Sequence, residues 1–159
     1  MSPNPEPVFG IATLDQIAGM TGKQHLQAII DGALPAPPIA RTMSFRMVEV
    51  GDGEVLFEAT PGPDLLNPLG GVHGGWALTL IDTVTGCAAH STLPAGVGFA
   101  SIETKANFSR PIKADTGLVR AEGRVISKGR TIISAEGKII DADGRVLAHG
   151  TSTVMVLAR

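Results

Sequence analysis

The stretch GGWALTLIDTVTGCAAH, residues 74–90, is the segment around which the rest of this chain is best understood. On a helix drawn over it, apolar or small residues occupy nearly every side. A helix without a polar face is stable when other parts of the protein cover it. The sequence therefore predicts one long buried helix from Gly74 to about His90.

Alternating apolar and polar residues on both sides of this stretch predict strands. Before it, Met43, Phe45 and Met47 alternate with polar neighbours, and Gly51-Asp52-Gly53 turns the chain into a strand over residues 54–60. After it, tight turns are expected at Gly129 and at Asp143-Gly144. The strands that these turns separate are expected over residues 98–109, 117–128, 130–141 and 146–157.

Three of the later strands carry a glycine in the middle of one face, at Gly123, Gly137 and Gly150. Small residues at the centre of successive strands let another element lie close to the sheet. The only long buried element available is the helix of residues 74–90. We therefore expect an α+β fold, in which an antiparallel sheet of five or six strands wraps around one central helix.

The residues before this domain are expected to form a short extension. Gly19 and Gly22 divide an apolar periodic region into two short helices, with Thr21 as the N-cap of the second. Residues 1–38 are too few for a domain, so we assign them to an N-terminal extension and residues 39–159 to the main domain.

Composition narrows the function classes. The 159 residues suit one domain, and a net charge of −2 without a run of Lys or Arg argues against a nucleic-acid partner. The most apolar stretch contains Asp82 and is too short to span a bilayer, so no membrane association is expected. A single cysteine and an N-terminus without a signal-peptide pattern predict a cytoplasmic protein. The low charged fraction, 18%, suggests buried sheet faces or subunit contacts.

Asp82 is the single ionisable acid in the predicted helix. Burial of an unpaired carboxylate is costly. Two interpretations follow: the side chain reaches solvent or a cap, or it is a base or nucleophile in a cleft.

Glycines surround the predicted start of the helix, in the sequence Asn67-Pro-Leu-Gly-Gly-Val-His73-Gly74-Gly75. Free backbone N–H groups at a helix N-terminus can stabilise an oxyanion, although glycine there can also serve close packing alone. Neither the P-loop motif nor the dinucleotide motif GxGxxG is present. Gly74 and Asp82 are separated by about 12 Å of helical rise, at ~1.5 Å per residue. If both act on one carbonyl, the simplest arrangement takes them from two antiparallel helices at a dimer interface.

The segment Asn67…His73-Gly74-Gly75…Asp82, followed by Ser101-Ile-Glu-Thr-Lys-Ala-Asn-Phe108-Ser-Arg-Pro111, resembles the hotdog-fold acyl-CoA thioesterases. The resemblance covers about residues 39–157. It is strongest to the branch with the phenylacetate-pathway, human thioesterase-superfamily and type II 4-hydroxybenzoyl-CoA thioesterases. The asparagine, His-Gly-Gly and acidic positions all fall at the spacing of that family.

The resemblance implies a role for each matching residue. Gly74 would donate its backbone N–H to the thioester carbonyl, Asn67 would bind the carbonyl or the attacking water, and His73 would hold Asn67 in place. From the facing subunit, Asp82 would be the general base or nucleophile and Ser101 would position the water. In this family two sheets join edge to edge with the helices in the centre, which implies a homodimer or a dimer of dimers, that is, a homotetramer.

Two features qualify these roles. One branch of the family has Glu at the position of Asp82 and Thr four residues later, where this chain has Gly86. This difference favours the Asp branch and argues against 4-hydroxybenzoyl-CoA as the substrate. Strict alternation also puts Ser101 on the face opposite Ile102, Ala106 and Phe108, as expected of an ordinary strand serine.

Other candidates have both a functional and a structural interpretation. Gly75 and Trp76 lie at the helix start and belong either to the substrate site or to close packing in the core. Lys128 and Arg130 flank a strand turn, where they meet the phosphates of coenzyme A or are solvated. Cys87 is expected to be a small core residue. The remaining histidines show no ligand spacing, so neither a metal nor a cofactor besides the coenzyme A thioester itself is expected.

The expected function is hydrolysis of an aryl- or medium-chain acyl-CoA to the free acid and coenzyme A. A non-catalytic acyl-CoA-binding hotdog module is one alternative, although a regulatory version would need an effector domain larger than residues 1–38 allow. A hotdog hydratase acting on an enoyl or hydroxyacyl thioester is another. Its pattern, an Asp and a His close together in a loop before the helix, fits this chain less well.

Overall fold

The computed structural model describes residues 7–157. It contains three short helices, then a β-hairpin, a long helix and four further strands. In chain order the elements are α1 (Leu14–Ile17), α2 (Gly22–Ile30), α3 (Pro38–Thr42), β1 (Phe45–Val50), β2 (Glu54–Ala59), the 3₁₀ turn η1 (Pro63–Leu65), α4 (Gly74–His90), β3 (Gly98–Phe108), β4 (Val119–Lys128), β5 (Ile132–Ile140) and β6 (Val146–Leu157).

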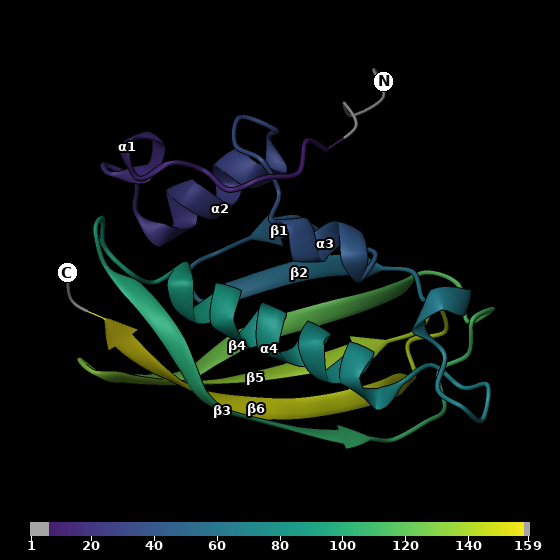
Figure 1. Cartoon of the computed structure of the whole chain (residues 1–159). Helices are drawn as coiled ribbons and strands as arrows, with labels where there is room; N and C mark the ends of the chain where they lie inside the picture. Colours follow the sequence, from purple (N-terminus) through teal and green to yellow (C-terminus); the bar gives the residue numbers. More distant parts are fainter. Residues whose placement is uncertain (1–6, 158–159) are drawn as a thin grey trace.

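The six strands form one sheet in the order β1-β2-β4-β5-β6-β3, and every neighbouring pair is antiparallel. The sheet curves around α4, which lies across its inner face (Figure 1). The predicted α+β architecture with one central helix is therefore confirmed. The last four strands lie within two residues of their predicted bounds.

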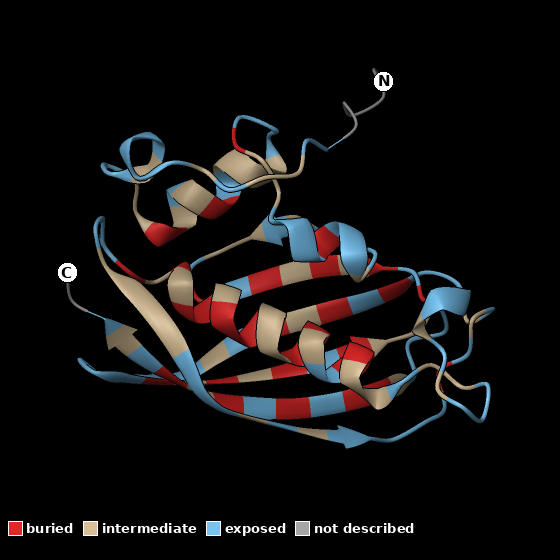
Figure 2. Ribbon diagram, in the orientation of Figure 1, coloured by how far each residue is buried: buried red, intermediate tan, exposed pale blue. Residues whose placement is uncertain are grey.

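The core lies between α4 and the inner face of the sheet. Leu80, Ile81 and Val84 have no exposed surface, and Trp76 is 2% exposed. The buried positions of α4 recur three and four residues apart, and the strands alternate between buried and exposed residues (Figure 2). The opposite side of α4 is only partly covered, and Leu78 is 37% exposed. The single chain therefore leaves one side of α4 incompletely buried. No helix within residues 7–157 combines the length and the apolar character needed to cross a membrane.

Two of the three central glycines admit α4 as predicted. A Cβ at Gly123 would collide with the carbonyl oxygen of Val84, and one at Gly137 would lie 2.8 Å from Val84 Cγ2. The prediction was wrong for Gly150. A Cβ there would meet the backbone carbonyl of Lys105, so Gly150 makes room for β3 and not for the helix.

The N-terminal segment packs along the β1 edge and near the end of α4 (Figure 1). The split into two helices is confirmed, and Thr21 caps α2 through a capping box. Helix α3 was not predicted. Pro38 occupies the first turn of α3, where its fixed φ is favourable and its missing N–H costs nothing. This helix spans the predicted domain boundary at residues 38/39.

Candidate active site

Asp82 lies in the middle of α4 with its side chain directed at β3. The carboxylate is half-buried, and its Oδ1 accepts a 2.7 Å hydrogen bond from Thr104 Oγ1. Within residues 7–157 no Lys, Arg or His lies within ion-pair distance of it. A hydroxyl, and not a cation, thus holds this carboxylate within the chain.

A β-bulge in β3 determines which residues face Asp82. The register against β6 shifts between Ser101 and Glu103, so that Ser101 pairs with the buried Val154 and Thr104 pairs with the buried Ser152. Residues on both sides of the bulge therefore face the helix. The prediction that Ser101 lies opposite Ala106 and Phe108 was wrong, because strict alternation does not allow for the extra residue.

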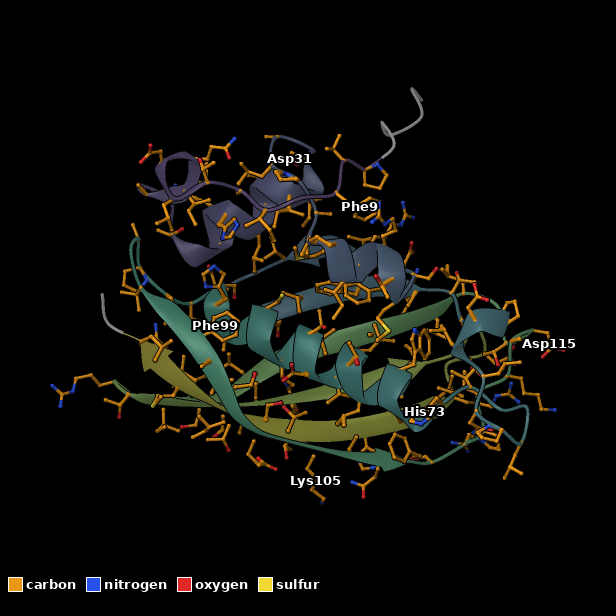
Figure 3. The ribbon with its side chains drawn as sticks, viewed as in Figure 1. Phe9, Asp31, His73, Phe99, Lys105 and Asp115 are labelled. Carbon is orange, nitrogen blue, oxygen red and sulfur yellow. The ribbon has the colours of Figure 1, made fainter. Side chains whose placement is uncertain are left out.

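The hydroxyl of Ser101 lies one helical turn from Asp82. Its Oγ is 4.0 Å from the position that a Cβ would take at Gly86, four residues after Asp82. The ring of Phe99 comes closer still, with its Cε2 3.0 Å from that position. Figure 3 shows Phe99 between β3 and α4. The absence of a side chain at Gly86 thus makes room for Phe99 beside Ser101.

The N-terminus of α4 is capped by His73. The ring Nδ1 of His73 accepts a 2.8 Å hydrogen bond from the N–H of Gly75, which leaves its proton on Nε2. The N–H of Gly75 is therefore committed to the cap. The N–H of Gly74 has no hydrogen-bond acceptor among residues 7–157. Beside it lies the half-exposed ring of Phe108, whose Cζ is 3.1 Å from the position of a Cβ on Gly74.

Asn67 organises the loop before α4. Its Oδ1 accepts hydrogen bonds from the N–H groups of Leu69, at 2.9 Å, and Gly71, at 3.3 Å. The His73 ring accepts its hydrogen bond from the N–H of Gly75 and makes none with Asn67. The implied contact in which His73 holds Asn67 is thus replaced by backbone contacts, because each side chain satisfies the nearest free N–H groups of its own turn.

Three further candidates make no hydrogen bond to Asp82 or Gly74 among the described residues. Trp76 is in the core, and its indole N–H donates to the carbonyl of Met43 at 2.8 Å. Lys128 donates to the carbonyl of Thr92 at 2.6 Å, just beyond the C-terminal end of α4. Arg130 is exposed in the same turn. Within one chain these cations thus lie at the opposite end of α4 from Gly74.

Comparison with known proteins identifies the family. Residues 69–148, half of the chain, match the model of the thioesterase superfamily. The chain belongs to this superfamily. Its hotdog fold and its assignment to the thioester hydrolases, both expected from the motif, are confirmed.

Relatives of this thioesterase come from distant organisms. Human acyl-coenzyme A thioesterase 13 is 24% identical over 132 residues, which cover 82% of this chain and 93% of the human protein. The structure of smu.793 from Streptococcus mutans bound to acetyl CoA is 26% identical with a TM-score of 0.66, and covers 73% of this chain and 90% of its own. The PaaI protein from the phenylacetic acid degradation operon of E. coli shares the fold, with a TM-score of 0.75 at 18% identity over 89% of this chain and 96% of its own.

Sequence reasoning missed Thr104, whose hydroxyl contacts the thioesterase's carboxylate, and Ser152, whose hydroxyl contacts Thr104. Thr104 had no assigned role, although alternation places it on the same face of the strand as Ala106 and Phe108. Ser152 had no assigned role either. A polar residue at an inward position beside a buried acid was the available signal. Burial, and secondarily the charge of Asp82, raises the pKa of the Cys87 thiol to about 12, which fits the predicted role of Cys87 as a core residue.

Proposed function

We propose that this thioesterase hydrolyses an acyl-CoA with an aryl or medium-chain acyl group, releasing the free acid and coenzyme A. The observation that carries the proposal is that α4 holds both a donor and an acceptor: the N–H of Gly74, which has no acceptor among residues 7–157, and the carboxylate of Asp82. The first suits a developing oxyanion. The second suits a nucleophile or a base.

Both groups act on one thioester only if two copies of the chain assemble. Gly74 and Asp82 belong to the same unbroken helix. Their separation of about 12 Å, at ~1.5 Å per residue, exceeds the reach of one carbonyl group. We propose a homodimer, or a dimer of dimers, with antiparallel α4 helices, so that Gly74 of one copy faces Asp82 of the other. The partly exposed Leu78 on the uncovered side of α4 is consistent with such a contact.

In the proposed reaction the N–H of Gly74 donates to the thioester carbonyl oxygen and stabilises the negative charge that develops there. The partner subunit's Asp82 attacks the carbonyl carbon or removes a proton from the attacking water. Collapse of the tetrahedral intermediate then expels the coenzyme A thiolate. If Asp82 is the nucleophile, this leaves an acyl-aspartyl anhydride, which water hydrolyses to the free acid and the regenerated carboxylate. Ser101, on the same face as Asp82, is proposed to position the water, and Asn67 to shape the loop that presents Gly74.

The substrate class follows from the surroundings of these groups. The ring of Phe108 is 59% exposed beside Gly74 and offers an apolar surface to an aryl or alkyl chain. In an antiparallel dimer, Lys128 and Arg130 of the partner copy would lie toward this end of α4, where we propose that they meet the phosphates of coenzyme A. The mechanism uses only groups of the chain and water. We propose the reducing cytoplasm as the compartment.

A panel of aryl-, short-, medium- and long-chain acyl-CoAs, assayed by thiol release, tests the proposal. We expect turnover of aryl or medium-chain substrates. We expect Asp82→Asn to lose about 100-fold or more in kcat, because removal of a nucleophile or general base costs at least this much. The variant should keep the oligomeric state of the wild type in analytical ultracentrifugation. Wild-type rates in Asp82→Asn would contradict the mechanism.

Two outcomes would favour other functions. Binding of acyl-CoA in calorimetry without thiol release would indicate a binding module, and water addition to an enoyl-CoA would indicate a hydratase. Single-turnover hydrolysis in ¹⁸O-water separates the two roles of Asp82. Label in its carboxylate indicates an anhydride intermediate, and its absence indicates a general base.

A further inference from the structure

A chain of hydrogen-bonded hydroxyls ends at the carboxylate of Asp82. Thr104 Oγ1 is 2.7 Å from Asp82 Oδ1, and Ser152 Oγ is 2.9 Å from Thr104 Oγ1. Thr85 Oγ1 is in turn 2.7 Å from Ser152 Oγ. Thr85 and Ser152 are 0% and 2% exposed, so the chain leads from the core to the half-buried carboxylate.

The single proton of each hydroxyl determines the direction of this chain. An ionised carboxylate only accepts, so Thr104 donates to Asp82. Since the proton of Thr104 is used in this bond, the hydroxyl of Ser152 donates to Thr104 Oγ1 at 2.9 Å. The hydroxyl of Thr85 in turn donates to Ser152 Oγ at 2.7 Å. Thr85 shares that proton with the carbonyl of Ile81, 2.8 Å away. All three protons thus point toward the carboxylate, and each bond strengthens the next.

The structure brings these hydroxyls together through two local features. Thr104 pairs with Ser152 and lies on the same inward face of β3 as Ala106, whereas the next residue, Lys105, points away from the helix (Figure 3). Gly150, two residues before Ser152, allows the backbone of β3 to approach β6 closely at Lys105.

We propose that Thr104, supported by Ser152 and Thr85, is a positioning residue for Asp82. This inference rests on the proposed function. The hydrogen bond at Oδ1 fixes the rotation of the carboxylate, so that Oδ2 is the oxygen presented to the thioester or to the attacking water. A reacting group held in one orientation avoids the entropic cost of finding it in each turnover.

Replacement of Thr104 by an isosteric residue tests the proposal. We expect Thr104→Val to lower kcat about 10- to 100-fold while KM changes less than about threefold, because the hydroxyl orients the reacting carboxylate and does not bind substrate. Thr104→Ser retains the hydroxyl and should recover kcat to within about threefold of the wild type. Thr153→Val is the matched control. Thr153 also donates to a carboxylate, that of Glu103, but both lie on the outer face of the sheet.

A second pair of variants tests the buried end of the chain. Thr85→Val leaves Ser152 without its donor and should lower kcat by about threefold, less than Thr104→Val because Asp82 keeps its own donor. Its control is Thr83→Val, since Thr83 bonds only to the carbonyl of Thr79. Thermal unfolding of all variants shows whether a lower kcat comes from loss of the fold or from loss of the Asp82 orientation. If Thr104→Val does not fold, Thr85→Val and Thr83→Val still test the proposal.

A double variant completes the test. Asp82→Asn and Asp82→Asn/Thr104→Val should show the same residual rate, because the hydroxyl acts through the carboxylate. Three results would overturn the inference and leave the proposed function standing: wild-type kcat in Thr104→Val, an equal loss in Thr104→Ser, or a further loss in the double variant. A wild-type protein that hydrolyses no acyl-CoA in the panel would overturn both.

Discussion

Gly74 contributes a backbone N–H to the proposed site, so truncation of a side chain cannot test it. Its position in the first turn of α4 offers another way. Proline is tolerated at the first helical residue. The preceding His73 has φ −61° and ψ 134°, the extended conformation that a following proline requires. An N–H can thus be removed at this residue without breaking the helix.

We predict that Gly74→Pro lowers kcat about 100-fold, the cost of losing one oxyanion donor. Gly74→Ala adds a Cβ near Phe108 but keeps the N–H, and it should lose less than about tenfold because a ring edge can yield. Steady-state kinetics of the two variants isolates the N–H. Equal losses would mean that contact with Phe108, and not the hydrogen bond, is what matters.

At the scale of elements, the close fit of α4 against β4 and β5 holds the site in place. Gly123 and Gly137 bring the strands so close to the helix that the backbone and side chain of Val84 fill the space of their missing side chains. Val84 is two residues from Asp82. Any displacement of α4 from the sheet would therefore also displace the carboxylate relative to β3.

We predict that Gly123→Ala lowers the free energy of unfolding by about 3 kcal/mol, because the added Cβ meets backbone that cannot rotate away. Gly98→Ala is the matched strand control. No atom lies within 4 Å of a Cβ at Gly98, so stability should be unchanged or rise by about 0.5 kcal/mol. Urea denaturation measures both. A small effect of Gly123→Ala would show that α4 shifts easily.

At the scale of the whole molecule, a histidine pair joins the N-terminal segment to the end of α4. His25 Nδ1 lies 3.3 Å from His90 Nε2, and a Cβ on Gly22 would collide with the carbonyl of His90. Burial, and then the charge of His25, lowers the pKa of His90 to about 4. Burial also lowers the pKa of His25.

This pair predicts a pH-dependent stability. Between pH 6.5, the ordinary value, and about 4, the unfolded chain binds more protons at His90 than the folded chain does. The stability that the neutral pair contributes is therefore full above pH 6.5 and falls as the pH decreases toward 4. Chemical denaturation across this range should show that dependence, weakened in His90→Gln and retained in the control His149→Gln, which changes an exposed histidine of β6. An unchanged dependence in His90→Gln would assign it to other groups.

The proposed assembly makes a prediction that a single chain cannot satisfy. Asp82→Asn and Gly74→Pro homodimers each lack one half of every site. After unfolding and refolding together, half of the dimers should be mixed and should contain one intact site, so that about a quarter of the wild-type activity returns. Refolding each variant alone is the control. No recovery in the mixture would place both groups of one site on the same chain.

Much of this organisation could be predicted from local pattern. The bounds of α4, the hairpin at Gly51-Asp52-Gly53 and the later strands follow from hydrophobic periodicity and turn residues, which act over a few neighbouring residues. The same holds for Asp82 and Gly74, because an acid inside an apolar helix and glycines before it are visible without a fold. Pro38 is the local exception, since one residue type suits both a helix start and a helix end.

Only the tertiary structure determined the surroundings of Asp82. The bulge that turns Ser101 and Thr104 to the same side arises from pairing with β6, about 50 residues away along the chain. The contact of Gly150 with β3, and the hydroxyl chain through Ser152 and Thr85, likewise join distant segments. The sequence by itself determined most of the elements and the positions of the proposed reacting groups. The register between strands determined which side chains contact Asp82 and Gly74, because register depends on long-range pairing and not on local preference.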